Sequence, residues 1–488
     1  MIIIKTNQKI KLIFFWTLVL MFFATSAVLI FYSFGYTFSL QKKMFIHAGT
    51  ITIKTNPQDV NVELNNVNVS KKTNRINNSF NISGVYPGEY LLKISAPGFK
   101  SWSKKISVHS GISTEFWNVL LTRDEYEQTS YDPSGIKNFF ISPTKNLIAT
   151  VFEGNEGLEI KILNSKDNTN ESSFVFPEFT FTDNKDENIE WSPQSQKIII
   201  PTKKGVEKNY IVADIDTNEI INLNNLINIK QISSVRWDPE NKNILYLMSE
   251  KNLYKIDITD AQQYKIIAQQ IASYDISQKY VYFMQFPSGI IFQTDRDGTQ
   301  KPVQITTSSL PEIDPSDSYK LVVYDEQRLT VKSTNGKFFV FNKSELGTFF
   351  KEISNDTVGS QFSNDGKKLL FWSNREVSIF FTRDWQTQPK REENEIFSII
   401  RFSEAIKNIH WSDDYEHVIF SAGNKIKIAE IDQRGNKNIF DITSLKTTDS
   451  KIVDNFSERK LYFTNLDDQN NPILQSILFP EKNSLLRF

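Results

Sequence analysis

A short pattern recurs along the last three quarters of the chain, and it restricts the possible folds more than any other feature. Each copy has an aromatic or apolar residue, a turn rich in Ser, Asp, Asn or Pro, and then an apolar run. The clearest copies begin at Ile141, Trp191, Trp237, Phe362 and Trp411. Trp191 lies 46 residues before Trp237, and Phe362 lies 49 residues before Trp411. A period of about 45 residues fits four short strands and their turns, which is one blade of a β-propeller.

The residues of each copy suit that structure. The aromatic residue ends one strand, the Pro-, Asn- or Gly-containing segment makes a tight turn, and the apolar run enters the interior of the blade. No segment here has a convincing helical period, so a helical solenoid is not expected. The residues that we predict to build the blades are Trp191, Pro193, Trp237, Pro239, Phe362, Asp365, Gly366 and Trp411.

Weaker copies of the pattern set the expected number of blades. They lie near Tyr274, Ser318 and Asp454, which brings the count to eight units. We therefore predict a β-propeller of eight blades over residues 130–488, or of seven if the unit around Tyr319 belongs to a neighbour. A strand from 132–141 is expected to close the ring against the last blade.

These copies resemble the Trp-Ser-Pro-Asp-Gly-Lys repeat of TolB-like and WD40-like bacterial β-propellers. The resemblance covers about 360 residues, but only Phe362–Phe371 keeps the Asp-Gly-Lys core. It implies a propeller without indicating which ligand the propeller binds.

A separate segment, residues 48–123, has short alternating runs separated by turns, which predicts a small β-sandwich. Its runs Gly49–Ile53, Val85–Ile94 and Gly98–Trp102 resemble a PEGA domain, although Gln58-Asp59-Val60 departs from the usual Gly-Ala of that family. The residues that carry the resemblance are Pro57, Pro87, Gly88, Tyr90, Gly98, Phe99 and Trp102. The resemblance implies a non-catalytic module outside the membrane of a bacterium or archaeon. Trp102 and Trp117 are expected to pack in the core rather than to stack on sugars.

The N-terminal region predicts a single membrane span. Residues 12–38 carry no charge and are mostly Phe, Leu, Val and Ile, so a helix of this length crosses a bilayer with some tilt. A cleaved signal peptide is the alternative, with its small-residue site at Ala24–Ala27, but mostly apolar residues continue beyond that site. The flanking lysines nearly balance. We expect residues 1–11 to form a cytoplasmic tail, residues 12–38 to span the membrane and the chain beyond them to lie outside the cytoplasm.

Composition excludes several kinds of chemistry. The chain has no cysteine, so disulfides, thiolate nucleophiles and Cys-based metal sites are impossible. Its formal net charge of −1 argues against a dedicated nucleic-acid binder. No Gly-x-Ser-x-Gly nucleophile elbow is present. We therefore predict no catalytic, cofactor-binding or metal-binding residues and no cofactor.

Three polar segments have a second interpretation. Asp295–Gly298 is expected to be a hairpin turn rather than part of a calcium loop. The acidic run of Asp183, Asp186, Glu187 and Glu190 is expected to be a solvated loop rather than a weak cation site, and Lys390–Glu395 is expected to be another solvated loop. His410 and His417 are expected to be structural.

Together these features predict an all-β protein with one N-terminal transmembrane helix, acting as a non-enzymatic binding or scaffold protein of the cell envelope. The expected partners are the membrane and a protein, peptide or glycan ligand on the propeller. Two alternatives are a membrane-anchored hydrolase of glycans or peptides, and an accessory subunit of a transport or sensing complex.

Overall fold

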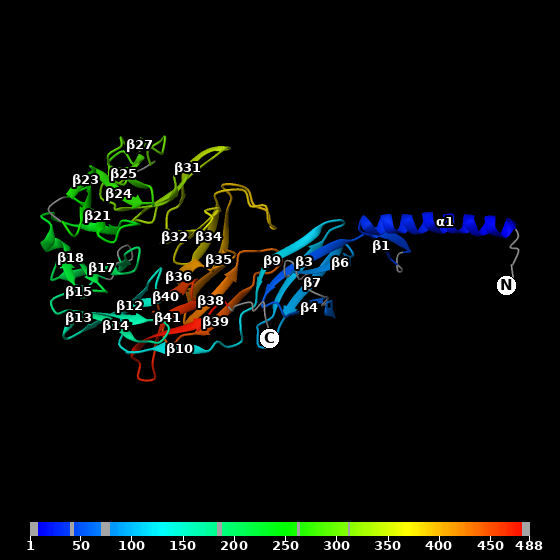
Figure 1. Cartoon of the computed structure of the whole chain (residues 1–488), viewed down its shortest axis with the longest axis horizontal. Helices are drawn as coiled ribbons and strands as arrows, with labels where there is room; N and C mark the ends of the chain where they lie inside the picture. The colour runs from blue at the N-terminus through cyan, green and yellow to red at the C-terminus, as the bar shows by residue number, and fades with distance from the viewer. Residues whose placement is uncertain are drawn as a thin grey trace, which may run out of the picture.

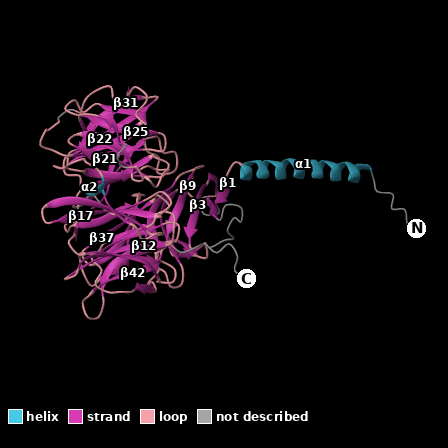
Figure 2. Cartoon of the chain, turned by 60° about the vertical axis from the view of Figure 1, so that its left-hand side comes forward, coloured by secondary structure: helices cyan, strands magenta, loops and turns pink. Residues whose placement is uncertain are grey.

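The computed structural model describes residues 8–39, 43–69, 79–182, 188–260, 264–310 and 313–480. Within these ranges the chain is almost entirely β-structure, and one long helix projects from one end of the molecule (Figure 2). A small β domain lies next to the helix, and a much larger set of sheets lies beyond it (Figure 1).

The N-terminal helix α1 (Gln8–Ser33) begins and ends earlier than the sequence predicted. Its segment Ile10–Ser33 is long and apolar enough to cross a membrane, a property that signal sequences share. The prediction of a span over residues 12–38 is wrong at its C-terminal end. Gly35 has a φ of +82°, which glycine adopts without strain, and the chain turns there into a strand.

A short hairpin follows the helix. Strands β1 (Tyr36–Ser39) and β2 (Met44–His47) pair antiparallel, and Phe31 of α1 stacks on Phe45 of β2. The side chains of Phe38 and Phe45 are largely exposed. The hairpin leads directly into the small domain. At this point the backbone N–H of Ala48 donates a hydrogen bond to the carbonyl of Gly35.

The small domain is a sandwich of two sheets around one apolar core. The first sheet has the order β6-β3-β9 and the second has the order β5-β4-β7-β8. The strands are β3 (Gly49–Asn56), β4 (Asn61–Leu64), β5 (Val67–Asn68), β6 (Ser79–Val85), β7 (Gly88–Ser95), β8 (Trp102–Val108) and β9 (Ser113–Leu120). Alternate residues of these strands point inward, as in β8, where Trp102, Lys104, Ile106 and Val108 are buried.

The rest of the described chain forms consecutive antiparallel sheets, which we number 1 to 8. Sheet 1 consists of β11 (Asn138–Ile141), β12 (Leu147–Gly154), β13 (Gly157–Asn164) and β14 (Asn170–Phe176). Sheet 2 consists of β15 (Thr180–Phe181), β16 (Glu190–Trp191), β17 (Lys197–Lys204), β18 (Glu207–Asp214) and β19 (Ile220–Asn222). Sheets 3 and 4 are β20 (Ser233–Trp237), β21 (Ile244–Ser249), β22 (Asn252–Asp257), β23 (Tyr264–Ala268), and β24 (Ile271–Ile276), β25 (Tyr280–Gln285), β26 (Ile291–Asp295), β27 (Val303–Gln304). The one-turn helix α2 (Leu223–Leu226) connects sheets 2 and 3.

Sheets 5 and 6 are β28 (Tyr319–Asp325), β29 (Arg328–Ser333), β30 (Phe338–Ser344), β31 (Gly347–Ser354), and β32 (Gly359–Phe362), β33 (Lys368–Trp372), β34 (Glu376–Phe381), β35 (Ile396–Arg401). Sheets 7 and 8 are β36 (Ile406–Trp411), β37 (His417–Ala422), β38 (Lys425–Glu430), β39 (Ile439–Ser444), and β40 (Ile452–Asn455), β41 (Lys460–Leu466), β42 (Pro472–Leu478) with β10 (Gln128–Tyr131). The unit around Tyr319 therefore begins a sheet of its own.

Each sheet shares a cluster of buried apolar side chains with the next. Sheet 8 in turn packs against sheet 1 through Tyr462 and Phe139, so the order of contacts returns to its start. The strand that joins the two ends of this region is β10, which pairs with β42. We expected that strand within residues 132–141, but Asn138–Ile141 is the first strand of sheet 1.

Candidate functional site

The predicted blade residues occupy equivalent places in their sheets. Trp191, Trp237, Phe362 and Trp411 are each the last residue of a short strand, which is the first strand of its sheet except in sheet 2, where β15 precedes it. Two of them make the same contact with the preceding sheet. The indole N–H of Trp237 donates to the carbonyl of Glu190 at 3.1 Å, and that of Trp411 donates to the carbonyl of Gln361 at 3.1 Å. These bonds tie neighbouring sheets together.

The turn after each aromatic residue is closed by local hydrogen bonds. Asp365 accepts from the hydroxyl of Ser363 at 2.7 Å and from the backbone N–H of Lys367 at 3.0 Å. Gly366, Ser195 and Tyr415 occupy the same turn position, and all three have positive φ. Pro193 and Pro239 are half-buried in the corresponding turns of sheets 2 and 3.

The predicted PEGA-motif residues lie mostly at strand ends of the small domain. Pro57 follows β3, Pro87 and Gly88 stand at the start of β7, and Tyr90 lies within it. Gly98 takes a φ of +77° before Phe99, whose backbone bridges to Arg123. Trp102 is buried, with 1% of its surface exposed, which removes it from consideration as a sugar-stacking platform.

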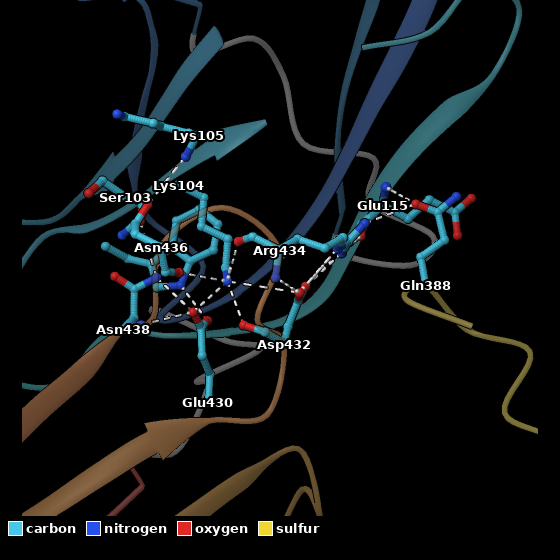
Figure 3. A network of polar contacts seen from close by, with 11 residues as sticks. Ser103, Lys104, Lys105, Glu115, Gln388, Glu430, Asp432, Arg434, Asn436 and Asn438 are labelled. Carbon is cyan, nitrogen blue, oxygen red and sulfur yellow. Dashed lines mark hydrogen bonds and ion pairs between the residues drawn. The ribbon is translucent and has the colours of Figure 1, made fainter. Parts of the chain in front are cut away.

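Trp102 and Lys104 instead begin a polar junction between the small domain and sheet 7. Figure 3 shows Lys104 in this junction. The indole N–H of Trp102 donates to Glu430 at 2.9 Å. The ammonium group of Lys104 lies 2.7 Å from the other carboxylate oxygen of Glu430 and donates to the carbonyls of Asp432 and Arg434 at 2.6 and 3.0 Å. Lys104 is fully buried, so these partners take the place of the water that solvates an exposed ammonium group.

The loop between β38 and β39 completes this junction (Figure 3). The guanidinium of Arg434 donates to the carbonyl of Glu115 at 2.7 Å and to the side chain of Gln388 at 3.0 Å. Gln388 also accepts from the backbone N–H of Glu115 and donates to the carbonyl of Ser113. Gln388 lies just before Lys390–Glu395, so the loop that we expected to be merely solvated begins beside a residue that contacts the small domain.

A cavity lies elsewhere, among sheets 2 to 5, and has a volume of about 480 Å³. Strands β16, β20, β24 and β28 supply about half of its wall, and β17, β18, β21, β29 and three loop residues supply the rest. This volume is in the range of small-ligand sites in proteins. The residues that carry its charge are Glu190, Lys208, Arg236, Lys320 and Lys332.

Arg236 is held at the wall of this cavity by two carboxylates. Its Nε lies 3.0 Å from Glu190, and its Nη1 lies 3.4 Å from Asp275. Burial raises the pKa of Glu190, and Arg236 opposes that effect. Glu190 and Asp275 raise the pKa of Arg236 against the effect of burial, which keeps the guanidinium charged. Asp275 also accepts from the backbone N–H of Val323 at 2.8 Å, which joins sheets 4 and 5.

The other polar segments have structural explanations in their surroundings. Asp295 accepts from the backbone N–H groups of Thr299 and Gln300, and these hydrogen bonds lower its pKa to about 2. Arg296 of the same turn pairs with Asp238 of sheet 3 at 2.8 Å. Glu190 faces the cavity, whereas Asp183, Asp186 and Glu187 lie outside the described residues. In the part of the chain that the structure covers, no group of three or more His, Asp or Glu side chains forms a metal site.

The two C-terminal histidines are both inside the protein. Burial lowers the pKa of His410 to about 4, and its Nδ1 lies 2.9 Å from the carbonyl of Asn408. Burial would also lower the pKa of His417, but the carboxylate of Asp414 at 2.6 Å reverses the effect and raises it.

Comparison with known families addresses the small domain directly. Residues 48–123 match the PEGA domain. The resemblance seen in the Pro-Gly-x-Tyr and Gly-Phe-x-x-Trp runs is therefore confirmed for this segment, which is the two-sheet sandwich beside α1. No curated protein matches the chain at a significant level.

Solved structures that resemble the chain include β-propellers. The β-propeller domain of Cps50 (Swd1) from Myceliophteria thermophila is 11% identical, with a TM-score of 0.39, 71% of this chain and 100% of that chain covered. A eukaryotic initiation factor is 9% identical with a TM-score of 0.46 (77% and 90% covered), and an oligogalacturonate lyase bound to manganese is 11% identical with a TM-score of 0.39 (73% and 98% covered). Likenesses of this size are not evidence for an activity.

Proposed function

We propose that this chain is a membrane-anchored, extracytoplasmic binding protein of a bacterial cell envelope, and that sheets 1 to 8 are the blades of a closed, eight-bladed, TolB-like β-propeller. The single observation that carries the proposal is the cavity of about 480 Å³ that four consecutive sheets enclose. In this role the cavity receives a ligand, and the PEGA domain holds the propeller at a fixed distance from the membrane.

The eight-blade arrangement is supported by the contacts between sheets. Every sheet of the region packs on the next, and sheet 8 includes β10 from the start of the region together with β42 from its end. Pairing the two ends in one sheet leaves few exposed edges, which suits a protein without cysteines that works outside the cell.

The membrane anchor is supported by α1 and the hairpin after it. None of the helix window that is apolar enough to span a membrane is buried against the rest of the protein. The exposed rings of Phe38 and Phe45 lie immediately beyond the helix, where aromatic side chains favour the interface between lipid and water.

A binding role, rather than hydrolysis, is supported by the charges inside the cavity. Glycoside hydrolysis needs one carboxyl group as a general acid and a second as a base or nucleophile. Glu190 is the one carboxylate among the described lining residues, and both it and its neighbour Asp275 pair with Arg236, an arrangement that does not suit a general acid with a separate base or nucleophile.

Protease treatment of intact cells tests the location. We expect the propeller to be digested in intact cells and the full chain to remain in the membrane fraction after carbonate extraction. A propeller that is protected until the cells are lysed, or a chain that carbonate releases from the membrane, would contradict the proposal.

A further inference from the structure

We propose that the cavity among sheets 2 to 5 binds an oxyanion, namely a phosphate or carboxylate group of a small ligand. This inference rests on the proposed function, because it names the chemistry of the ligand that the cavity receives. Four cationic side chains and one carboxylate line the cavity along the described chain: Lys208, Arg236, Lys320, Lys332 and Glu190. Among the described side chains at this wall, cations outnumber carboxylates even when Asp275, the second partner of Arg236, is counted.

Arg236 is the cationic side chain of the site that two carboxylates hold in place. Its two carboxylate partners occupy Nε and Nη1, and its Nη2 group donates to no described residue. The side chain is 46% exposed and stands in the cavity wall, so part of it is accessible to a ligand in the cavity. A guanidinium presents its donors in a planar fork that matches carboxylate and phosphate oxygens.

The lysines add positive charge from three different strands. Lys208 lies on β18, where its ammonium group is 5.4 Å from the ring of Tyr210. Lys320 is exposed on β28, and Lys332 on β29 donates to the carbonyl of Val358 at 3.2 Å. An ammonium group has three donors, so Lys332 retains hydrogen-bonding capacity toward a ligand. A concave surface with an excess of one sign of charge concentrates the opposite charge.

The neutral groups of the wall hold the strands in place. The hydroxyl of Ser273 accepts from the backbone N–H of Leu321 at 2.9 Å, and that of Tyr274 donates to the carbonyl of Tyr246 at 2.9 Å. These bonds join neighbouring strands or sheets, so the backbone that carries the cationic groups is held rigidly. A rigid site loses less conformational freedom when it binds a ligand.

The test is calorimetric titration of the full chain in detergent. Pyrophosphate serves as the phosphate probe, glucuronate as the carboxylate probe and glucose as the neutral control. We expect at least one anionic probe to bind, glucose not to bind, and the affinity to fall with added salt. The double variant Lys320→Glu/Lys332→Glu should weaken binding at least tenfold. Lys351→Glu on β31, an exposed lysine of the same sheet outside the cavity, should leave binding unchanged.

The two probes distinguish the sources of the oxyanion. Binding of pyrophosphate alone assigns a phosphate ligand, and binding of glucuronate alone assigns a carboxylate ligand. The proposal is overturned if neither probe binds, if glucose binds equally well, or if the double variant binds like the unmodified chain. If the double variant does not fold, Lys320→Gln/Lys332→Gln replaces it, with the same expected direction. Since this assay uses purified protein, its outcome is independent of where the chain resides in the cell.

Discussion

The turn between β32 and β33 of sheet 6 brings Gly366 against the ring of Tyr324 from sheet 5. A side chain at this position meets two obstacles. Gly366 has a φ of +63°, and a Cβ atom there would lie 2.3 Å from a ring carbon of Tyr324. The ring is held in place, because its hydroxyl donates to the carbonyl of Asn364 at 2.8 Å. The backbone therefore favours glycine here, and the ring from the neighbouring sheet leaves no room for a larger residue.

We predict that Gly366→Ala destabilises the propeller more than backbone strain alone explains. Gly205 has the same φ of +63°, and a Cβ atom added there would meet nothing within 4 Å, so Gly205→Ala is the matched control. The control should cost about 1 kcal/mol from the left-handed conformation. Gly366→Ala should cost about 1–3 kcal/mol more from the clash. Urea unfolding of both variants measures the difference, and equal losses would show that Tyr324 moves aside freely.

Asp454 is a second residue with a predictable effect on stability. Neither of its carboxylate oxygens has a hydrogen-bond partner among the described residues, and burial, together with Asp413, raises its pKa well above the usual range. The unfolded chain therefore releases this proton at a lower pH than the folded chain. Stability is lost as the pH rises from about 4.

We predict that Asp454→Asn raises the free energy of unfolding by about 1 kcal/mol at pH 7, and by much less at pH 3. Urea unfolding at the two pH values measures this. The exposed Asp468 supplies the control Asp468→Asn, which should change little at either pH. A gain of the same size at both pH values would show that the carboxylate of Asp454 is not the cause.

At the level of whole elements, the first strands of the sheets are linked by their tryptophans. Trp237 and Trp411 donate to a carbonyl of the preceding sheet, whereas the indole N–H of Trp191 has no partner among the described residues. Trp191→Phe thus measures the loss of ring size alone. We predict that Trp237→Phe and Trp411→Phe each cost about 1 kcal/mol more than Trp191→Phe. Thermal unfolding of the three variants compares them, and equal losses would exclude a role for the hydrogen bonds between sheets.

The strands and turns of these elements could be predicted because their signals are local. Trp237, Pro239 and the apolar run after them lie within a few residues of one another, and so do Pro87, Gly88 and Tyr90. The cavity could not be predicted, because Lys208, Arg236 and Lys332 line one cavity only after sheets 2 to 5 have packed together. The contact of Gln388 with Ser113 likewise joins positions 275 residues apart, and neither residue carries a local signal for it.

At the scale of the whole molecule, the PEGA domain contacts one part of the region formed by sheets 1 to 8, and the cavity lies in another part. The junction involves the loop of sheet 7 and Gln388, whereas the cavity is lined by sheets 2 to 5. Phe440 of β39 also packs on the core of the PEGA domain. Gly435 lies so close to β8 of the PEGA domain that a Cβ atom on this glycine would be 2.3 Å from the carbonyl oxygen of Lys105. The PEGA domain and sheet 7 therefore form one continuous packed unit, which leaves the cavity uncovered by the PEGA domain.

The buried ammonium group of Lys104 is the part of this junction whose loss should separate the two domains. Lys104→Ala leaves Glu430 buried without its cation, a change that costs about 3–5 kcal/mol when one member of a buried pair is removed. We predict that the variant unfolds in two calorimetric transitions where the unmodified chain shows one, and that trypsin cuts it faster near Arg123. Lys105→Ala is the control, because that neighbouring side chain is exposed and its contact with Asn436 uses the backbone. Retention of a single transition in Lys104→Ala would mean that the apolar contact at Phe440 holds the domains together without the ion pair, and the variant Phe440→Ala would then be the one that separates them.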